Sequence, residues 1–288
     1  MRIRQKAPER YRLTMQPQAH TDSYYAASVT EVTDYAPLRG EQSADVCVIG
    51  AGFTGLATAL YLAERGYDVH VVESNRVGWG ASGRNGGQFI AGIAGEKNIA
   101  KHLGRDVEDV FGELRWAGND IIREIVNKYG IQCDLKFGYL DVAIKERHLR
   151  DQEADYERLQ KANFPYEFRH LSRDETRETI GTSAYIGALL NMANGHLHPL
   201  KMCVGEARAA ASLGATIYEQ SPVLNIEKGG RPRVVTQRGS ITADAVAGTL
   251  EQFDLFANVK PLKIPGAHLF SKPMVALGVL FYQIKDRL

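Results

Sequence analysis

Three glycines and one acidic residue are the first residues of this 288-residue chain whose types and spacing point to chemistry. Gly50, Gly52 and Gly55 have the spacing G-x-G-x-x-G, and Glu73 follows them further along the chain. In this pattern the middle glycine lets a diphosphate approach the main chain, and an acid about 20 residues onward accepts hydrogen bonds from ribose hydroxyls. The pattern therefore predicts a binding site for a dinucleotide.

Two strands and a helix are needed to position these residues. The apolar run 46–49 predicts a strand that is buried on both faces, and the run 69–72 predicts a second one. Between them, the apolar positions of 56–63 predict a helix that ends at Gly66. Because strand, glycines, helix, strand and acid occur in order, they predict a nucleotide-binding βαβ unit rather than an ordinary one. An acid at the end of the second strand favours an unphosphorylated ribose, which fits both NAD and FAD.

A glycine-rich segment, residues 76–89 (RVGWGASGRNGGQF), follows the acid. It begins where a nicotinamide dehydrogenase would normally enter another helix, and residues without side chains allow a close approach to a ligand. Ser82 is a hydrogen-bond donor for a phosphate, and Arg84 supplies positive charge. A mobile surface loop is the alternative, but the position next to the glycine pattern favours an extended flavin dinucleotide lying along the segment.

Several stretches resemble the FAD-dependent amine and amino-acid oxidases of the D-amino-acid oxidase and glycine oxidase superfamily. They are GAGFTG (50–55), ESNR (73–76) and GASGRNGGQ (80–88), and GHLHPL (195–200) is similarly specific. Within that superfamily, the chain from about residue 23 onward is most similar to the gamma-glutamylputrescine oxidases. The resemblance implies FAD as cofactor, with contacts from Gly50, Gly52, Phe53, Thr54, Gly55, Glu73, Ser74, Arg76, Gly80, Ala81, Ser82, Arg84, Asn85, Gly86, Gly87, Gln88 and Val223.

The resemblance also implies an activity, the oxidation of a C–N bond in a small amine or amino acid. Hydride passes to flavin N5, the imine hydrolyses, and oxygen reoxidises the flavin and gives hydrogen peroxide, while the protein supplies binding and orientation. The catalytic residues implied are Arg84 and Asn85 near the flavin and His198 near the substrate, with His196 beside it. No residue is identified as a general base, and the H-x-H pair is a poor metal site because no third ligand is near it.

The implied fold is α/β, with an FAD-binding Rossmann-like domain and a partial α+β substrate domain. The expected FAD-binding domain is discontinuous, and the substrate domain is inserted into it. Helices are expected at 106–129, at 146–162 and from Pro199 to Gly214, a strand pair around Gly138, and strand, turn and strand at 214–228. The expected domains are an N-terminal extension (1–40), the FAD-binding domain (41–90 and 196–250), the partial substrate domain (91–195) and a C-terminal tail (251–288).

The resemblance breaks within residues 241–256. A strand at 245–248 runs directly into 251–254, which resembles the C-terminal tail of the family. This implies the deletion of a long internal segment that completes the substrate domain and the flavin-ring site in the family. A catalytically defective FAD-binding remnant is therefore the alternative to an active oxidase, and an NAD-dependent dehydrogenase is a third reading.

Composition and charge limit the other function classes. A net charge of +1 gives no reason to expect nucleic acid as a partner, and no apolar run approaches the ~18 residues of a transmembrane helix. Three widely spaced cysteines match no zinc or redox spacing, which favours a reducing, cytoplasmic setting. The basic first twenty residues are expected to form a disordered extension, with a basic contact tail as the alternative.

Overall fold

The fold comes from a computed structural model that describes residues 17–92, 106–161 and 163–248. The chain divides into two compact units. Within the described residues, the first unit contains 17–86, 126–133 and 198–248, and the second contains 87–92, 106–125, 134–161 and 163–197. The basic first residues and the expected tail at 251–288 lie outside the described residues, as does the end of the expected helix at 162.

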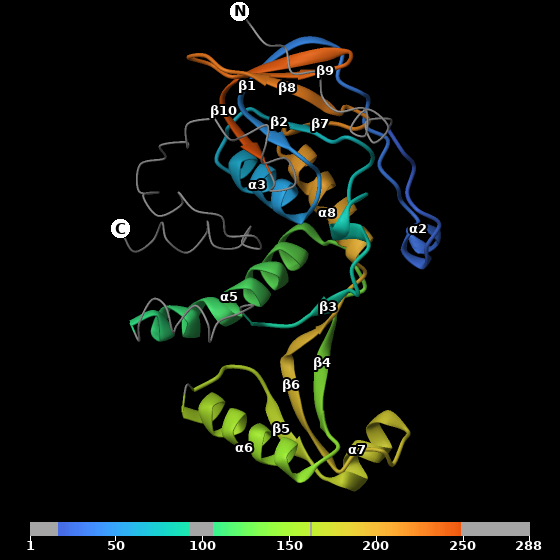
Figure 1. The fold of residues 1–288 in the computed structure, drawn as a ribbon, viewed down its shortest axis with the longest axis vertical. Coiled ribbons are helices and arrows are strands. Elements are labelled where there is room, and N and C mark those ends of the chain that lie inside the picture. The colour runs from blue at the N-terminus through green and yellow to red at the C-terminus, as the bar shows by residue number, and fades with distance from the viewer. Residues whose placement is uncertain (1–16, 93–105, 162, 249–288) are drawn as a thin grey trace, which may run out of the picture. The chain divides into compact units, whose positions relative to one another are not determined.

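A six-stranded sheet forms the centre of the first unit. Across the sheet the order is β7 (Thr216–Tyr218), β2 (Val69–Val72), β1 (Gly40–Ile49), β10 (Gly239–Gly248), β9 (Arg233–Thr236) and β8 (Val223–Glu227). Strands β7, β2, β1 and β10 are parallel, and β10 also pairs with an antiparallel ribbon of β9 and β8 (Figure 1). The mixed α/β class expected from the sequence is confirmed.

Two helices of the first unit pack against each other, α3 (Phe53–Glu64) and α8 (Pro199–Ser212). The buried positions of α3 recur at helical spacing and include Leu56, Ala59 and Leu60. A separate hydrophobic cluster joins the parallel strands to the antiparallel ribbon. All four residues of β2 are buried, which explains its uninterrupted apolar sequence.

The strands β1 and β10 are longer than the apolar runs that predicted them. The sequence indicated strands at 46–49 and 245–248, whereas β1 begins at Gly40 and β10 begins at Gly239. The first four residues of β1 are exposed, so they have no apolar pattern, yet they pair in parallel with the start of β10. The hydrogen bonds to a distant partner strand extend both elements, and sequence periodicity cannot detect such a partner.

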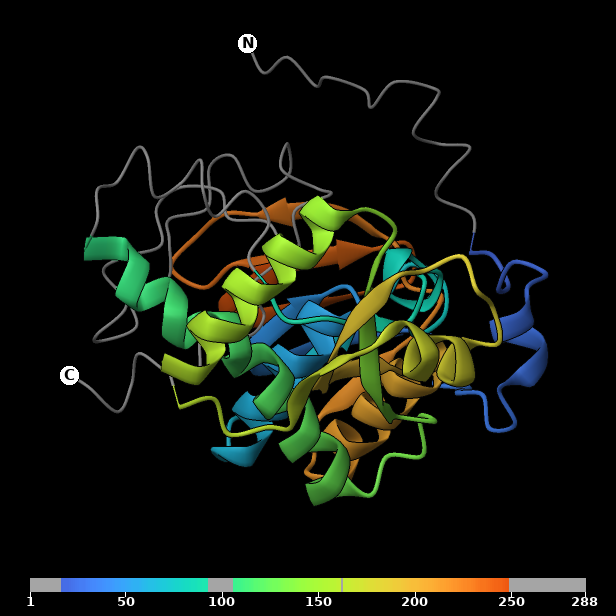
Figure 2. The ribbon, with the colours of Figure 1, turned by 90° about the horizontal axis from the view of Figure 1, so that it is seen from below.

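An antiparallel sheet forms the second unit. Its central strand β6 (Gly187–His196) pairs with β4 (Lys136–Ala143), β5 (Phe168–Leu171) and the short β3 (Gln88–Phe89). Helix α6 (Glu146–Lys161) packs against β4 and β6, as Figure 2 shows. Helix α7 (Arg173–Ile180) precedes β6, and α5 (Asp106–Tyr129) contributes residues to both units.

The expected strand pair around Gly138 is wrong. One strand, β4, passes through this position with an irregular register between Phe137 and Tyr139. Gly138 has a φ of +112°, which is accessible to glycine and strained for other residues. The glycine therefore marks a bulge in one strand and not a turn between two.

Within the described residues, every helix is too short or too polar to cross a membrane.

Candidate functional site

A tight glycine turn, residues 50–55, connects β1 to α3. Gly50 has a φ of +100°, and its amide donates to the carbonyl of Val72 at 2.8 Å. A methyl group placed on Gly55 would lie 1.9 Å from the carbonyl oxygen of Gly50, so only glycine fits there. Gly52 is the N-cap of α3 and provides no side-chain cap for the helix. The turn thus brings backbone groups and a helix N-terminus together, the arrangement that favours a bound phosphate.

Glu73 lies directly beside this turn, at the end of β2. Its carboxylate accepts hydrogen bonds from the amides of Ala51 and Asn75, each at 2.8 Å. Burial raises the pKa of the Glu73 carboxyl, and the two backbone donors act in the opposite direction. The expected ribose-binding acid and the expected diphosphate turn are therefore adjacent in the structure.

The glycine-rich segment, residues 76–89, also contacts this turn. The amide of Gly78 donates to the carbonyl of Ala51 at 2.8 Å, and the hydroxyl oxygen of Ser82 accepts from the amide of Phe53 at 3.1 Å. A methyl group on Gly52 would approach that Ser82 oxygen to 2.7 Å. The serine hydroxyl therefore lies at the first turn of α3, where the sequence places a phosphate.

Arg84 and Asn85 lie on the exposed part of this segment, after the short helix η1 (Ala81–Gly83). The guanidinium carbon of Arg84 lies 4.1 Å from the centre of the Trp79 ring. The Asn85 side chain donates to the carbonyl of Ser82 at 2.8 Å and closes the turn locally. Both side chains are therefore held close to the segment, at the surface of the first unit.

The remaining expected cofactor residues have different surroundings. Phe53 and Ser74 are half-buried, and Thr54, Gly80, Ala81 and Gly86 are exposed. Val223 is buried at the start of β8, and the amide of Ser221, just before it, donates to the Glu73 carbonyl at 2.8 Å. Gly87 and Gln88 belong to the second unit, where the carbonyl of Gly87 accepts from the amide of Leu197 at 2.8 Å.

His198 is a helix cap in the structure. It is 5% exposed, and its Nδ1 accepts from the amide of Lys201 at 3.1 Å at the start of α8. Its Nε2 lies 3.0 Å from the hydroxyl oxygen of Ser28, so both ring nitrogens have hydrogen-bond partners. His196, which was expected beside it near the substrate, is exposed at the end of β6 in the second unit. The geometry of His198 supports a positioning role rather than proton transfer.

We expect His198→Ala to lower the free energy of unfolding by about 1 kcal/mol, because the helix loses its N-cap acceptor. Urea unfolding followed by circular dichroism measures this change. His196→Ala is the matched control, with an expected change below ~0.5 kcal/mol at an exposed position. Equal stability of the two variants would show that the cap contributes nothing.

Glu219 is a buried acid that the sequence reasoning missed. It follows β7 directly, as Glu73 follows β2, and the register pairs the preceding residues, Tyr218 and Val72. Its carboxylate accepts from Arg76 at 2.8 Å, and Arg76 also contacts Asp34 at 2.9 Å. These acids raise the pKa of the Arg76 guanidinium, chiefly through the Glu219 bond. The shared pattern, an acid directly after an apolar strand, is the signal that could have identified Glu219.

Comparisons with known proteins agree with this geometry. Residues 45–257 match the DAO family, described as FAD dependent oxidoreductase. The chain is 41% identical over 242 residues to a probable oxidoreductase, OrdL, of Haemophilus influenzae, and the match covers 83% of this chain and 56% of that protein. It is 39% identical over 231 residues to the gamma-glutamylputrescine oxidoreductase of Escherichia coli, covering 79% of this chain and 53% of that protein.

Solved structures of similar fold include two amino-acid enzymes. The glycine oxidase of Geobacillus kaustophilus has a TM-score of 0.59 at 23% identity, over 76% of this chain and 58% of that chain. The L-amino acid deaminase of Proteus vulgaris has a TM-score of 0.61 at 26% identity, over 80% of this chain and 52% of that chain.

All four matches cover only part of the relative's length. This chain spans just over half the length of each of these relatives. The family itself is established by the match of residues 45–257 and by the identity to the two bacterial oxidoreductases. This chain therefore belongs to the DAO family of FAD-dependent oxidoreductases.

Proposed function

We propose that this protein binds FAD through its first unit and oxidises a C–N bond of a small amine or amino acid. The single observation that supports this most strongly is the arrangement around the glycine turn. Glu73 bonds to the turn, and the glycine-rich segment bonds to the turn and to the first turn of α3. A glycine turn at a helix N-terminus suits the phosphates of an adenosine diphosphate, and a nearby acid suits its ribose.

The residues of the first unit fit such a ligand chemically. Gly52 keeps the start of α3 free of a Cβ, and α3 has no side-chain cap from its own N-cap residue. The carboxylate of Glu73 has two acceptor oxygens, suited to the two hydroxyls of a ribose. In this proposal the first unit is the cofactor domain, and the second unit contributes the substrate domain.

FAD supplies the redox step when bound, since its ring accepts the hydride. The protein binds and orients the cofactor, and it holds positive charge near the ring through Arg84, with Asn85 beside it. We assign no general base. The proposed electron acceptor is oxygen, and the substrate class is an amine of the gamma-glutamylputrescine type, because that compound names one of the relatives. Three buried free thiols support a reducing, cytoplasmic setting.

The test is to purify the chain, record its visible spectrum and assay hydrogen peroxide with gamma-glutamylputrescine and with glycine. We expect absorption at about 450 nm, which is a general property of flavins. We also expect peroxide release with gamma-glutamylputrescine. A protein that is colourless when purified, and that stays colourless and binds no FAD after incubation with it, would contradict the proposal. Binding of NAD in place of FAD would support the dehydrogenase alternative.

A second candidate is an FAD-binding module without oxidase activity. The observation that favours it is the length of the match, 53% of the Escherichia coli oxidoreductase. Missing parts of a substrate site prevent the close positioning that catalysis needs. The proposed deletion lies next to Gly248, and the residues after it are outside the described part of the chain. Coloured protein that releases no peroxide would support this candidate.

A further inference from the structure

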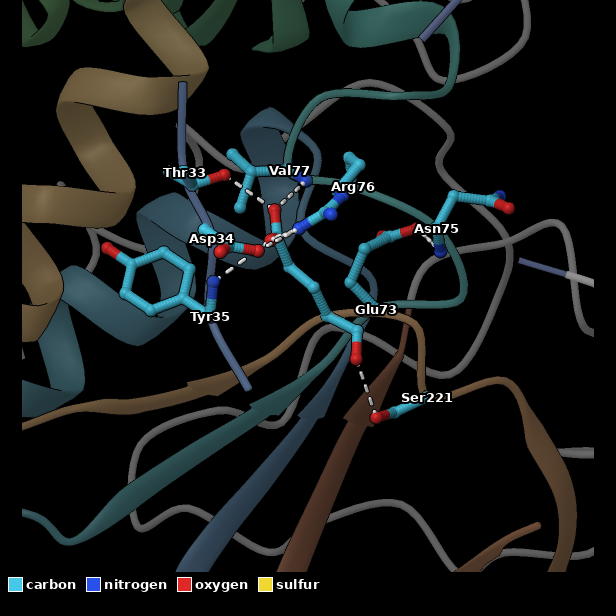
Figure 3. Close-up of polar contacts among 9 residues, drawn as sticks. Thr33, Asp34, Tyr35, Glu73, Asn75, Arg76, Val77 and Ser221 are labelled. Atoms are coloured by element: carbon cyan, nitrogen blue, oxygen red, sulfur yellow. Dashed lines mark hydrogen bonds and ion pairs between the residues drawn. The ribbon is translucent and has the colours of Figure 1, made fainter. Parts of the chain in front are cut away.

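The Glu219 carboxylate is fully buried and accepts hydrogen bonds from four donors. One carboxylate oxygen accepts from the Thr33 hydroxyl at 2.5 Å and the Val77 amide at 2.8 Å. The other accepts from the Tyr35 amide at 3.1 Å and from Arg76 at 2.8 Å. Figure 3 shows these four residues arranged around the carboxylate.

The surroundings of this carboxylate supply hydrogen-bond donors and one positive charge. An ionised carboxylate is an acceptor with no donor, and all four of its partners are donors. A buried charge persists when it is paired and its lone pairs are used, and Arg76 provides the opposite charge. Glu219 is therefore a buried charged residue whose hydrogen bonds connect several parts of the first unit.

The four donors come from two segments that are far apart in sequence. Thr33 and Tyr35 belong to the N-terminal segment, defined here as residues 18–38, and Arg76 and Val77 open the glycine-rich segment. The two segments also bond directly to each other. Arg76 donates to Asp34 at 2.9 Å, and the Trp79 indole donates to the carbonyl of Ala19 at 2.8 Å. The Gln18 amide also donates to Asn75, the residue just before the glycine-rich segment, at 2.8 Å. The N-terminal segment thus lies along the start of the glycine-rich segment.

The bond between Glu219 and the glycine-rich segment lies next to the bond between that segment and the glycine turn. The Val77 amide donates to Glu219, and the next amide, from Gly78, donates to the carbonyl of Ala51. The backbone of Glu219, just after β7, is held as well. Its carbonyl accepts from the Ser221 hydroxyl at 2.8 Å, and the same hydroxyl oxygen accepts from the Leu38 amide at 2.8 Å. Glu219 thus bonds to Val77, the residue directly before the contact between Gly78 and the turn.

We infer that Glu219 is a positioning residue for cofactor binding, which holds the glycine-rich segment against the glycine turn by tying it to the N-terminal segment. The inference rests on the proposed function for the identity of the ligand. Glu219 acts through Val77 and Arg76 and has no contact of its own with the glycine turn among the hydrogen bonds of the described residues. The N-terminal segment is accordingly part of the cofactor-binding unit, in place of the extension outside the domain that the sequence suggested.

The variant Glu219→Gln tests this inference. A glutamine keeps the shape but has one acceptor oxygen. Its NH₂ group therefore faces the Val77 amide in one orientation, and the Tyr35 amide and Arg76 in the other, all of which are donors that cannot accept. We expect the dissociation constant for FAD to rise by about tenfold or more, measured by flavin fluorescence titration. The chain has two tryptophans, Trp79 and Trp116. In a Trp116→Phe background, the emission of Trp79 reports on the glycine-rich segment alone, and we expect it to move to longer wavelength in the FAD-free variant.

Val234→Ala is the matched control for general destabilisation, because Val234 is fully buried in β9 and is not among the four hydrogen-bond donors of the Glu219 carboxylate. It should change the dissociation constant for FAD by less than about twofold, and it should leave the emission wavelength of Trp79 unshifted. An equal loss of affinity in Val234→Ala would overturn the inference, as would an unchanged affinity in Glu219→Gln.

Two further measurements keep the result unambiguous. If Glu219→Gln does not fold, Thr33→Val decides, since it removes one donor from the N-terminal segment and is expected to shift Trp79 emission in the same direction. An unshifted emission in that variant overturns the inference. If the unmodified protein binds no FAD, the proposed function fails, while the Trp79 emission of the FAD-free protein still tests the positioning role.

Discussion

Replacing Gly55 by alanine is expected to abolish FAD retention and to lower the free energy of unfolding by about 3 kcal/mol, at the upper end of overpacking effects. The added methyl group would lie 1.9 Å from the carbonyl oxygen of Gly50 and 3.4 Å from a methyl of Val48. A backbone oxygen cannot move aside as a side chain can, so α3 must shift away from β1. Urea unfolding and flavin absorption of the purified variant measure the two effects.

Gly230→Ala is the matched control for this prediction. A methyl group on Gly230 meets no atom within 4 Å, and the residue is exposed between β8 and β9, outside the residues expected to contact FAD. We expect a change in stability below ~0.5 kcal/mol and unchanged FAD retention. The close-packing argument is wrong if Gly55→Ala retains FAD as well as Gly230→Ala does.

The second large effect is expected at Glu206, where Glu206→Met should stabilise the protein at alkaline pH. Glu206 is 4% exposed on α8, and among the described residues its Oε2 has no hydrogen-bond partner. Burial raises the pKa of this carboxyl to about 8. Methionine has a side chain of similar length, is a good helix former, and needs no hydrogen-bond partner when it is buried.

The sign follows from where the proton is bound in each state. Between the usual pKa of 4.5 and about 8, the folded protein keeps the Glu206 proton and the unfolded chain releases it. The unfolded chain is therefore favoured progressively as pH rises through this window, at ~1.4 kcal/mol per pH unit as an upper limit. Glu206→Met removes this dependence. We expect it to gain about 2–4 kcal/mol over the unmodified protein at pH 8 and little at pH 4.5.

Urea unfolding of both proteins at several pH values measures this difference, and the comparison cancels the titration of all other groups. Glu178→Gln, which replaces an exposed acid in α7, serves as the control, and we expect it to change the stability by less than ~0.5 kcal/mol. A constant difference between Glu206→Met and the unmodified protein across the window would mean that Glu206 is ionised in the folded state.

The local parts of the cofactor site could be predicted from the sequence because their causes are local. The glycine spacing, the apolar face of α3 and the buried strand β2 each reflect a turn, a helix period or burial on two faces within a few residues. The acid at position 73 follows from the same pattern. Its actual partners, two backbone amides, required the structure.

Elements that depend on distant partners were missed or shortened. Strand β6 has strands on both sides and a mostly buried sequence with no clean alternation, so periodicity did not indicate it. The exposed first half of β1 is a strand only because β10 pairs with it. His198 was expected near the substrate by resemblance, which remains a prediction, and its contact with Ser28, 170 residues away, required the structure.

By itself, the sequence determined the family, the α/β class and the glycine turn with its acid, because these follow from residue types at short spacing. Only the tertiary structure decided which acids act together. Glu73 and Glu219 are far apart in the chain, yet Glu73 accepts from the Asn75 amide and Glu219 from the Val77 amide, two residues further on. Both acids follow strands that are parallel and paired, β2 and β7, with Val72 opposite Tyr218. Parallel pairing places the ends of distant strands at one edge of a sheet, and no local pattern encodes that pairing.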